Sequence, residues 1–255
     1  MSDNTAPAIQ TVQRAAVILN AFTVGRPRLT LAELTEALHS TKGTAYRYAK
    51  ALRETGLLQY DSDTATYTLG PQLLSLESVA RSGLSIIAAA ESKMQNLLKE
   101  LDRTIILSVW DGETAAVVRC VDNTSGVIRL SIKPGSRLDL FESAQGRVFC
   151  AYLNSSEIPS LDRHLRASPR FQDELDVIRA GGISKNSPTV HGVRTIAAPV
   201  FEYRRITACL AVVGTAIAVA EEREEQIVSS LRTAAMSLSA DVGTPAEEWP
   251  IQPTP

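Results

Sequence analysis

Two helix-start signals lie close together near the amino end, and their spacing restricts the fold of this region. Thr30 is a good N-cap residue, and Glu33, three residues later, completes a capping-box pattern ahead of an apolar stripe. A second cap, Ser40 or Thr41, follows after one short helix and opens a helix that runs to about Glu54. Two short helices joined by a turn of a few residues indicate a helix-turn-helix.

The segments on both sides of this pair extend the pattern. From Ile9 to Phe22, apolar residues recur every three or four positions, which predicts a first amphipathic helix. After the third helix, residues 57–60 and 66–69 have the composition of strands and are joined by a polar turn. Three helices followed by a hairpin predict a winged helix-turn-helix domain over residues 9–70.

The third helix has an apolar side and a basic side. Ala45, Tyr48, Ala49 and Leu52 share one side, which we expect to pack against the other two helices. Four cations and no acid lie between positions 40 and 53, although the whole chain has a formal net charge of -2. The positive charge is therefore concentrated on one helix.

A run of four charges is by itself often a solvated surface. Here the run lies on the second helix of a helix-turn-helix, and small residues in its first turns allow close approach to a DNA groove. An arginine can donate two hydrogen bonds to guanine, and a tyrosine can contact a phosphate or a thymine methyl group. We therefore predict that this surface binds double-stranded DNA through Arg26, Arg28, Thr41, Lys42, Gly43, Thr44, Tyr46, Arg47 and Lys50.

The rest of the chain has a different composition. Pro71 favours the start of a connecting helix, and we expect residues 71–84 to form a linker helix. Residues 85–241 combine β-branched runs with helical segments, which predicts an α+β domain large enough to enclose a small-molecule pocket. Residues 242–255 contain four prolines, and we expect them to form a disordered tail.

The composition also bears on cellular location and redox chemistry. Cys120, Cys150 and Cys209 lack CxxC spacing, which indicates buried reduced thiols, with redox sensing as the less favoured alternative. The chain begins without a basic segment followed by an apolar core, and no apolar run approaches the roughly 18 residues of a membrane span. We expect a soluble, cytoplasmic protein with no membrane partner.

Catalysis would require a clustered nucleophile, base or metal set. His39, His164 and His191 fall in different segments without metal-ligand spacing, and no nucleophile-elbow or nucleotide-binding motif is present. We expect no catalytic residues, no metal site and no cofactor.

The order of these features resembles the IclR family of bacterial transcriptional regulators from Ile9 to about Ala240. The stretches that carry the resemblance are "TVQRAAVILNAF" and "TKGTAYRYAKALRETGLL" in the first domain, and "GVIRLSIKPGSRLDLFESAQGRVFCAYL" and "HGVRTIAAPVFEYRRITACLAVVG" in the second. The resemblance implies a homodimer or homotetramer that binds an operator palindrome through the winged helix-turn-helix. It also implies that the linker helix leads to a GAF-like α/β domain that holds a small organic effector, often a carboxylate.

The resemblance also implies which positions hold the effector. They are Val127, Leu130, Ser143, Ala144, Gln145, Lys185, Thr195, Ala211 and Val213. Thr195 replaces a frequent cysteine, and Ala211 and Val213 replace frequent serines, so the pocket is expected to be more apolar than is usual in the family. Lys185 stands where an acid is common and could pair with a carboxylate.

These departures favour an aromatic or partly hydrophobic acid or amide. The alternative is that these residues only pack the core and that Lys185 is solvated. Other departures are Asp139 in place of a typical proline, Arg147 in place of a usual lysine, and "FEYRRI" without the usual glycine of that hairpin. A DNA-binding regulator without small-molecule input, whose second domain only drives assembly, also stays open.

Overall fold

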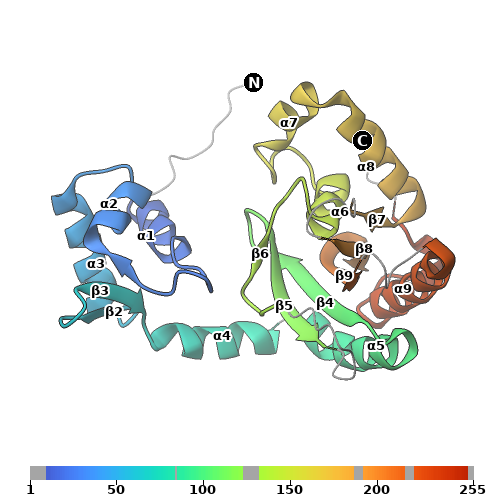
Figure 1. The fold of residues 1–255 in the computed structure, drawn as a ribbon, viewed down its shortest axis with the longest axis horizontal. Helices are drawn as coiled ribbons and strands as arrows, with labels where there is room; N and C mark the ends of the chain where they lie inside the picture. The colour runs from blue at the N-terminus through green and yellow to red at the C-terminus, as the bar shows by residue number, and fades with distance from the viewer. Residues whose placement is uncertain (1–9, 84, 123–131, 187–191, 216–220, 252–255) are drawn as a thin grey trace. The chain divides into compact units, whose positions relative to one another are not determined.

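The computed structural model describes residues 10–83, 85–122, 132–186, 192–215 and 221–251. Contacts between Cα atoms divide the chain into two compact units, residues 1–83 and 84–255 (Figure 1).

Three helices and a small antiparallel sheet form the body of the first unit. The sheet has the strand order β1-β3-β2. The elements are α1 (Gln10–Asn20), β1 (Leu29–Thr30), α2 (Leu31–Ala37), α3 (Lys42–Glu54), β2 (Leu58–Asp61) and β3 (Thr66–Leu69). This is the predicted arrangement of three helices and a hairpin. The segment expected to be a linker holds a fourth helix, α4 (Gln72–Gly83).

The helix boundaries follow the local signals in the sequence. Thr30 caps α2: its Oγ1 accepts a hydrogen bond from the Glu33 amide at 3.3 Å, and a Glu33 carboxylate oxygen accepts one from the Thr30 amide at 2.7 Å. Thr41, rather than Ser40, caps α3 by accepting a hydrogen bond from the Thr44 amide. Gly56, with φ of 73°, follows the end of α3 in the left-handed conformation.

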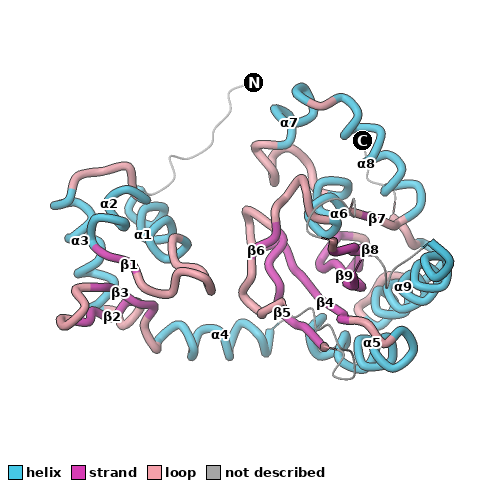
Figure 2. Tube along the Cα trace, viewed as in Figure 1, coloured by secondary structure: helices cyan, strands magenta, loops and turns pink. Residues whose placement is uncertain are grey.

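A six-stranded antiparallel sheet forms the centre of the second unit, in the order β6-β5-β4-β9-β8-β7. Figure 2 shows these strands in magenta between helices. The strands are β4 (Thr104–Trp110), β5 (Ala115–Val121), β6 (Arg137–Leu138), β7 (Ser184–Lys185), β8 (Val193–Glu202) and β9 (Arg205–Thr215). The helices are α5 (Ser85–Leu101), α6 (Ala144–Tyr152), α7 (Leu161–Ala167), α8 (Pro169–Gly181) and α9 (Glu221–Asp241).

The two faces of this sheet are covered by different helices. On one face, Ile105 and Leu107 of β4 belong to the same buried cluster as Met94 of α5 and Leu231 of α9. We call this the α5/α9 face. Alternate residues of each strand point to opposite faces, so the neighbouring positions of these strands form the other face.

The opposite face packs against α6, and we call it the α6 face. Cys209 and Ala211 of β9 lie in one buried cluster with Val148 and Phe149 of α6. Helix α8 contacts α6 and contributes Leu175 to the same cluster. The mixed α+β architecture that the sequence predicts is therefore confirmed.

The prediction of a disordered tail over 242–255 is wrong for the residues that the structure describes. A short 3-10 helix, Ala246–Glu248, follows α9, and both Trp249 and Ile251 are buried in the core of the α5/α9 face. The Trp249 indole donates a hydrogen bond of 2.9 Å to the carbonyl oxygen of Pro199 in β8. Burial of two large apolar side chains outweighs the local effect of the prolines.

Within the described ranges, no single helix is long and apolar enough to cross a membrane. One bent pair, Gln72–Ala80 with Ser85–Leu101, meets that test by length and composition only.

Candidate nucleic-acid interface and ligand site

Helix α3 buries one face in the first unit, and this determines which of its side chains are exposed. Ala45 and Ala49 are fully buried in the first unit. Tyr46 is 49% exposed, and Arg47 and Lys50 are exposed as well. The helix therefore presents the predicted tyrosine and cations to the solvent.

The other predicted DNA-binding residues lie on the first turn of α3 or before α2. Thr44 is half-buried, and its Oγ1 lies 3.1 Å from the Oγ1 of the capping residue Thr41, so these two hydroxyls are engaged in holding the helix start. The remaining ones are exposed: Arg26, Arg28, Lys42 and Gly43.

Several of these cations already contact a carboxylate. Arg26 pairs with Glu33 at 2.7 Å, and Arg28 pairs with Asp61 at 3.1 Å. Lys50 is 3.8 Å from the carboxylate of Glu54. Lys42 and Arg47, by contrast, form no ion pair with any part of the chain that the structure describes. Among the predicted cations of this helix, the charges of these two side chains are therefore less neutralised than that of Lys50.

The carboxylates that hold the two arginines stay ionised. The pKa of Glu33 is lowered, first by the hydrogen bond from the Thr30 amide and then by the Thr30 hydroxyl and Arg26. The pKa of Asp61 is lowered, first by the hydrogen bonds from Thr64. Arg26 and Arg28 are therefore positioned by capping and turn residues, and a DNA phosphate would have to compete with these carboxylates to bind either arginine.

A groove of about 670 Å³ lies between α3 and the small sheet. Its walls include Tyr46 and Lys50 from α3, together with Arg53 and Tyr60, two residues outside the predicted set. The Arg53 guanidinium carbon lies 5.1 Å from the centre of the Tyr60 ring, which is a cation–π geometry. The charge of Arg53 was visible in the sequence, but its contact with Tyr60 depends on how the β2–β3 hairpin folds back onto α3.

The β2–β3 turn, residues 61–66, does not resemble a basic wing. It contains Asp61 and Asp63 and no lysine or arginine. The Asp61 carboxylate accepts hydrogen bonds from the amides of Asp63 and Thr64, which stabilise the turn. The tip of the hairpin is therefore negative, and four of the eight lysines and arginines of this unit lie on α3.

Three of the predicted effector residues lie together on the α6 face of the large sheet. Val213 of β9 is directly opposite Thr195 of β8, and Ala211 is opposite Ala197. Cross-strand partners share a face. Thr195, Ala211 and Val213 are all buried there.

The amino end of α6 brings two more predicted residues to this face. Ala144 is fully buried in the same cluster as Ala211, and Gln145 is 3% exposed. The Gln145 Nε2 is buried and has no hydrogen-bond partner within the described residues. A buried amide donor without a partner is costly, so a ligand or water at this position would satisfy it.

Ser143, the third predicted residue of this segment, acts as the N-cap of α6. Its hydroxyl accepts a hydrogen bond from the Gly146 amide at 2.9 Å and donates one to the carbonyl of Asp139 at 2.5 Å. Asp139, where proline is typical, accepts from the amides of Phe141 and Glu142. The Ser143 hydroxyl is thus used in holding the start of the helix.

Lys185 does not lie where the sequence analysis placed it. Its strand partner is Ile196 of the α5/α9 face, and its ammonium group pairs with Glu224 of α9. The preceding residue, Ser184, pairs with Ala197 of the α6 face and is 1% exposed, with no described partner for its hydroxyl. Because successive side chains of β7 point to opposite faces of the sheet, Ser184 rather than Lys185 lies on the α6 face.

Ser108 was also missed by the sequence analysis. It lies opposite Cys209 on the α6 face and is fully buried, and its Oγ has no partner among the described residues. A single serine within the apolar strand "TIILSVW" gave no signal of this position. Two predicted effector residues, Val127 and Leu130, lie outside the described residues.

The cysteines are protonated in the folded protein. Burial raises the pKa of Cys150 to about 12 and, together with a hydrogen bond to Asp122, raises that of Cys120 to about 11. Burial also raises the pKa of Cys209. None of these thiols has the lowered pKa of a reactive cysteine.

The histidine in α7 packs between aromatic rings. His164 stacks on Phe141 with ring centroids 3.8 Å apart and contacts Phe171 edge-on. Within the described ranges, no cluster of three or more histidine, cysteine, aspartate or glutamate residues could hold a metal ion.

Comparisons with known proteins agree with this two-part arrangement. Residues 11–62 match the IclR helix-turn-helix domain, and residues 79–240 match the C-terminal domain of the bacterial transcriptional regulator IclR. The HTH-type transcriptional regulator KdgR of Escherichia coli is 25% identical over 94% of this chain and 95% of its own length. The glycerol operon regulatory protein of Streptomyces coelicolor is 26% identical over 92% of this chain and 97% of its own.

Solved structures share the fold. A putative IclR transcriptional regulator from Silicibacter sp. superposes with a TM-score of 0.84 at 24% identity, over 96% of this chain and all of that one. An IclR homologue from Microbacterium hydrocarbonoxydans, crystallised with 4-hydroxybenzoate, gives a TM-score of 0.70 at 18% identity, over 91% of this chain and 98% of that one.

The exposed basic helix, the sheet-and-helix second unit and the two family matches lead to one assignment. The relatives named above are regulators rather than enzymes. The chain belongs to the IclR family and is a DNA-binding transcriptional regulator.

Proposed function

We propose that the protein binds an operator as an oligomer through α3, and that a small organic acid or amide bound on the α6 face changes this affinity. The ligand has an aromatic or partly hydrophobic body. The observation that carries the ligand site is the Gln145 side chain, which is 3% exposed and has an Nε2 without a described partner.

The surroundings of Gln145 suit a carboxylate or an amide. The amino end of a helix carries partial positive charge and unsatisfied N–H groups, and Gln145 lies in the first turn of the nine-residue helix α6. The Gln145 amide adds a donor of fixed position. Lys185 faces the other side of the sheet, so the helix start and Gln145 take over the binding role considered for Lys185.

The rest of the α6 face favours an apolar ligand body. Ile106, Val117 and Val213 form a buried apolar cluster on this face, next to Ala211. Besides the Gln145 amide, the hydroxyls of Ser108 and Ser184 lack a described partner there. An aromatic acid fits this mixture better than a small, wholly polar acid does. The homologue crystallised with 4-hydroxybenzoate supports the same class of ligand.

The oligomer is supported by an apolar surface on α4. Leu74 is 72% exposed, Val79 is 71% exposed and Leu76 is 49% exposed. Exposed large apolar side chains of this kind, on more than one side of a helix, are typical of an element that another protein copy covers. A dimer would place two α3 helices at half-sites about 34 Å apart, the repeat of B-DNA.

Ligand binding and DNA binding would be coupled through a shift in the equilibrium between two conformational states of this oligomer. A ligand that binds one state better raises the population of that state. Because both α3 helices must match their half-sites, a change in their spacing alters operator affinity without the loss of any side-chain contact.

The test combines Gln145→Leu with 4-hydroxybenzoate as the probe. Calorimetry on the full chain measures binding of the probe, and fluorescence anisotropy measures affinity for the DNA next to the protein's own gene. We expect wild type to bind the probe and to change its DNA affinity, and Gln145→Leu to bind the probe at least ten-fold more weakly with unchanged basal DNA affinity.

Gln172→Leu, on α8, is the matched control and should behave as wild type. If Gln145→Leu binds the probe normally, the ligand site lies elsewhere. If neither the probe nor its amide binds or alters DNA affinity, the second unit serves assembly only.

A further inference from the structure

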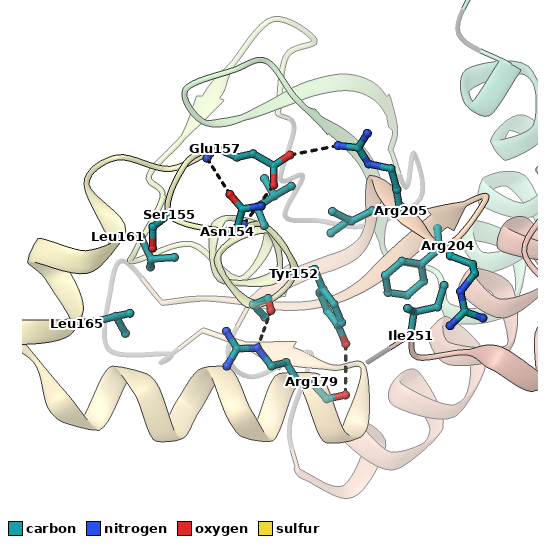
Figure 3. A pocket seen from close by; sticks show the side chains of 14 residues that line it. Tyr152, Asn154, Ser155, Glu157, Leu161, Leu165, Arg179, Arg204, Arg205 and Ile251 are labelled. Carbon is teal, nitrogen blue, oxygen red and sulfur yellow. Dashed lines mark hydrogen bonds and ion pairs between the residues drawn. The ribbon is translucent and has the colours of Figure 1, made fainter. Parts of the chain in front are cut away.

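A second cavity lies at the carboxyl end of α6, whereas the proposed effector site lies at the amino end of that helix. It has a volume of about 720 Å³, within the range of small-molecule sites. Its wall includes Ala151, Tyr152 and Leu153, and it shares no residue with the predicted effector set. Figure 3 shows its lining side chains.

The floor of this cavity is apolar and preformed. Phe201 is 1% exposed, Leu161 is 3% exposed and Ile251 is 7% exposed. The Tyr152 ring meets Phe201 edge-on with centroids 5.1 Å apart, and its hydroxyl donates a hydrogen bond of 3.1 Å to the carbonyl of Ile178. Buried and tethered side chains keep the cavity open without rearrangement.

The rim carries several arginines, each of which also contacts a carboxylate: Arg179 contacts Asp176, Arg204 contacts Glu248 and Arg205 contacts Glu157. Three arginines and one carboxylate are among the lining residues: Arg179, Arg204, Arg205 and Glu157. They come from α8, from the β8–β9 hairpin and from the loop after α6. In Figure 3, Arg205 extends toward Glu157, whereas Arg204 extends toward Ile251.

Arg205 has most of its hydrogen-bonding capacity available. A guanidinium has five N–H donors. Within the described residues, Arg205 makes one side-chain contact, from Nη2 to Glu157 at 3.4 Å, and its side chain is 84% exposed. The neighbouring Arg204 pairs with Glu248, and its side chain remains 63% exposed.

The backbone that carries these arginines is strained. Tyr203 and Arg204 form the two-residue turn between β8 and β9 with φ values of 46° and 68°, where asparagine or glycine is preferred. The turn is held because the Arg204 amide donates to the Thr244 hydroxyl at 3.1 Å. Residues kept in such conformations cluster at ligand clamps. Here the strained turn places two arginines at the mouth of a cavity.

We propose that this cavity is a second ligand site, for a small organic anion that joins a carboxylate to an apolar body. Arg205 and Arg204 bind the carboxylate by charge-assisted hydrogen bonds, and the floor formed by Phe201, Leu161 and Ile251 takes the body. A bare inorganic anion would leave the apolar floor uncovered. A neutral compound would gain no ion pair with Arg205, whose one side-chain contact among the described residues is to Glu157. The site does not depend on the proposed effector site.

The experiment uses 4-phenylbutyrate and its uncharged amide, 4-phenylbutyramide, as probes in calorimetry on the full chain. Both are titrated into the Gln145→Leu variant, in which the proposed effector site is disabled. We expect this variant to bind the acid, and to bind the amide at least ten-fold more weakly. The further substitution Arg204→Gln with Arg205→Gln should weaken binding of the acid at least ten-fold.

Arg163→Gln with Arg166→Gln, which removes two exposed arginines of α7 outside the cavity, is the charge-matched control and should leave binding of the acid unchanged. Arg205→Glu is a second test, since an 84% exposed side chain tolerates the change and the new carboxylate repels the probe. The proposal is overturned if the acid does not bind, if acid and amide bind equally, or if both arginine variants bind the acid as the control does.

Discussion

The indole of Trp249 lies directly against Gly182, so closely that a Cβ on Gly182 would come within 2.5 Å of Cη2 of the indole. Gly182 ends α8 with φ of 65°, a conformation that glycine adopts without strain. A larger residue at position 182 would therefore be unfavourable for two reasons: the left-handed backbone conformation and a clash with the indole. This contact packs the segment after α9 against the end of α8.

Trp249→Ala should destabilise the second unit by about 3 to 5 kcal/mol, because it removes a buried aromatic ring and its hydrogen bond to Pro199. Urea unfolding followed by circular dichroism measures the change. Trp249→Phe is the matched control and should lose about 1 kcal/mol, the value of the hydrogen bond. If Trp249→Ala unfolds at the same urea concentration as wild type, the segment after α9 adds nothing to stability.

Arg47→Ala should weaken operator binding by about 1 to 3 kcal/mol and relax sequence specificity, as expected for an arginine that reads a base edge. Arg47 is exposed on α3 and pairs with no carboxylate of the described residues, so its removal leaves no protein group unsatisfied. Fluorescence anisotropy with operator and with random DNA measures both effects, and Arg163→Ala is the control. An equal loss on both DNAs would make Arg47 a phosphate contact.

Replacing Leu74 and Val79 on α4 by glutamate should dissociate the proposed oligomer, because the new charges would fall in an apolar contact. These side chains are 72% and 71% exposed in the single chain, so the fold should survive the change. Sedimentation velocity gives the oligomeric state. Replacement of the exposed Gln72 and Glu77 on the same helix by alanine is the control, and a wild-type mass for the Leu74 and Val79 variant would place the interface elsewhere.

Stability should fall as the pH rises above about 9. Burial raises the pKa of Cys150 from 9.0 to about 12, so the folded state retains a proton that the unfolded state releases between these values. The stabilisation is complete below pH 9 and is lost as the pH approaches 12. Urea midpoints at pH 8 and pH 10.5 measure the loss, which should be smaller in Cys150→Ala. An identical loss in both proteins would assign it to other groups.

The local parts of the fold were predictable because their causes lie within a few residues. The capping box of Thr30 and Glu33 acts over one turn, and it located α2 correctly. Helix α7 has only seven residues, and its N-cap, Ser160, makes no capping hydrogen bond with its side chain, so its local signals are weak. The edge strands β6 and β7 have two residues each. They are recognisable as strands only from their hydrogen-bonded pairing with β5 and β8, which the local sequence does not reveal.

The site was less predictable because it depends on strand register and distant packing. Lys185 and Ser184 differ by one position, and only the pairing with β8 decides which of them faces α6. The composition of the segment after α9 indicated disorder, whereas Trp249 finds its partners in β8 and α8, far away in sequence. The resemblance to the family supplied Gln145, but its unpartnered amide became visible only with the packing of α6 on the sheet.

The ion pairs of Arg26 with Glu33 and of Arg28 with Asp61 affect how DNA binding responds to salt. Each phosphate that a protein cation neutralises releases counterions from the duplex, which adds about 0.9 to the slope of log affinity against log salt. An arginine that leaves a carboxylate for a phosphate exposes that carboxylate, which then attracts a cation from solution. We therefore expect Arg26 and Arg28 to contribute less net ion release than Lys42 or Arg47. The affinity of this regulator for DNA should then depend less on ionic strength than its number of basic residues suggests.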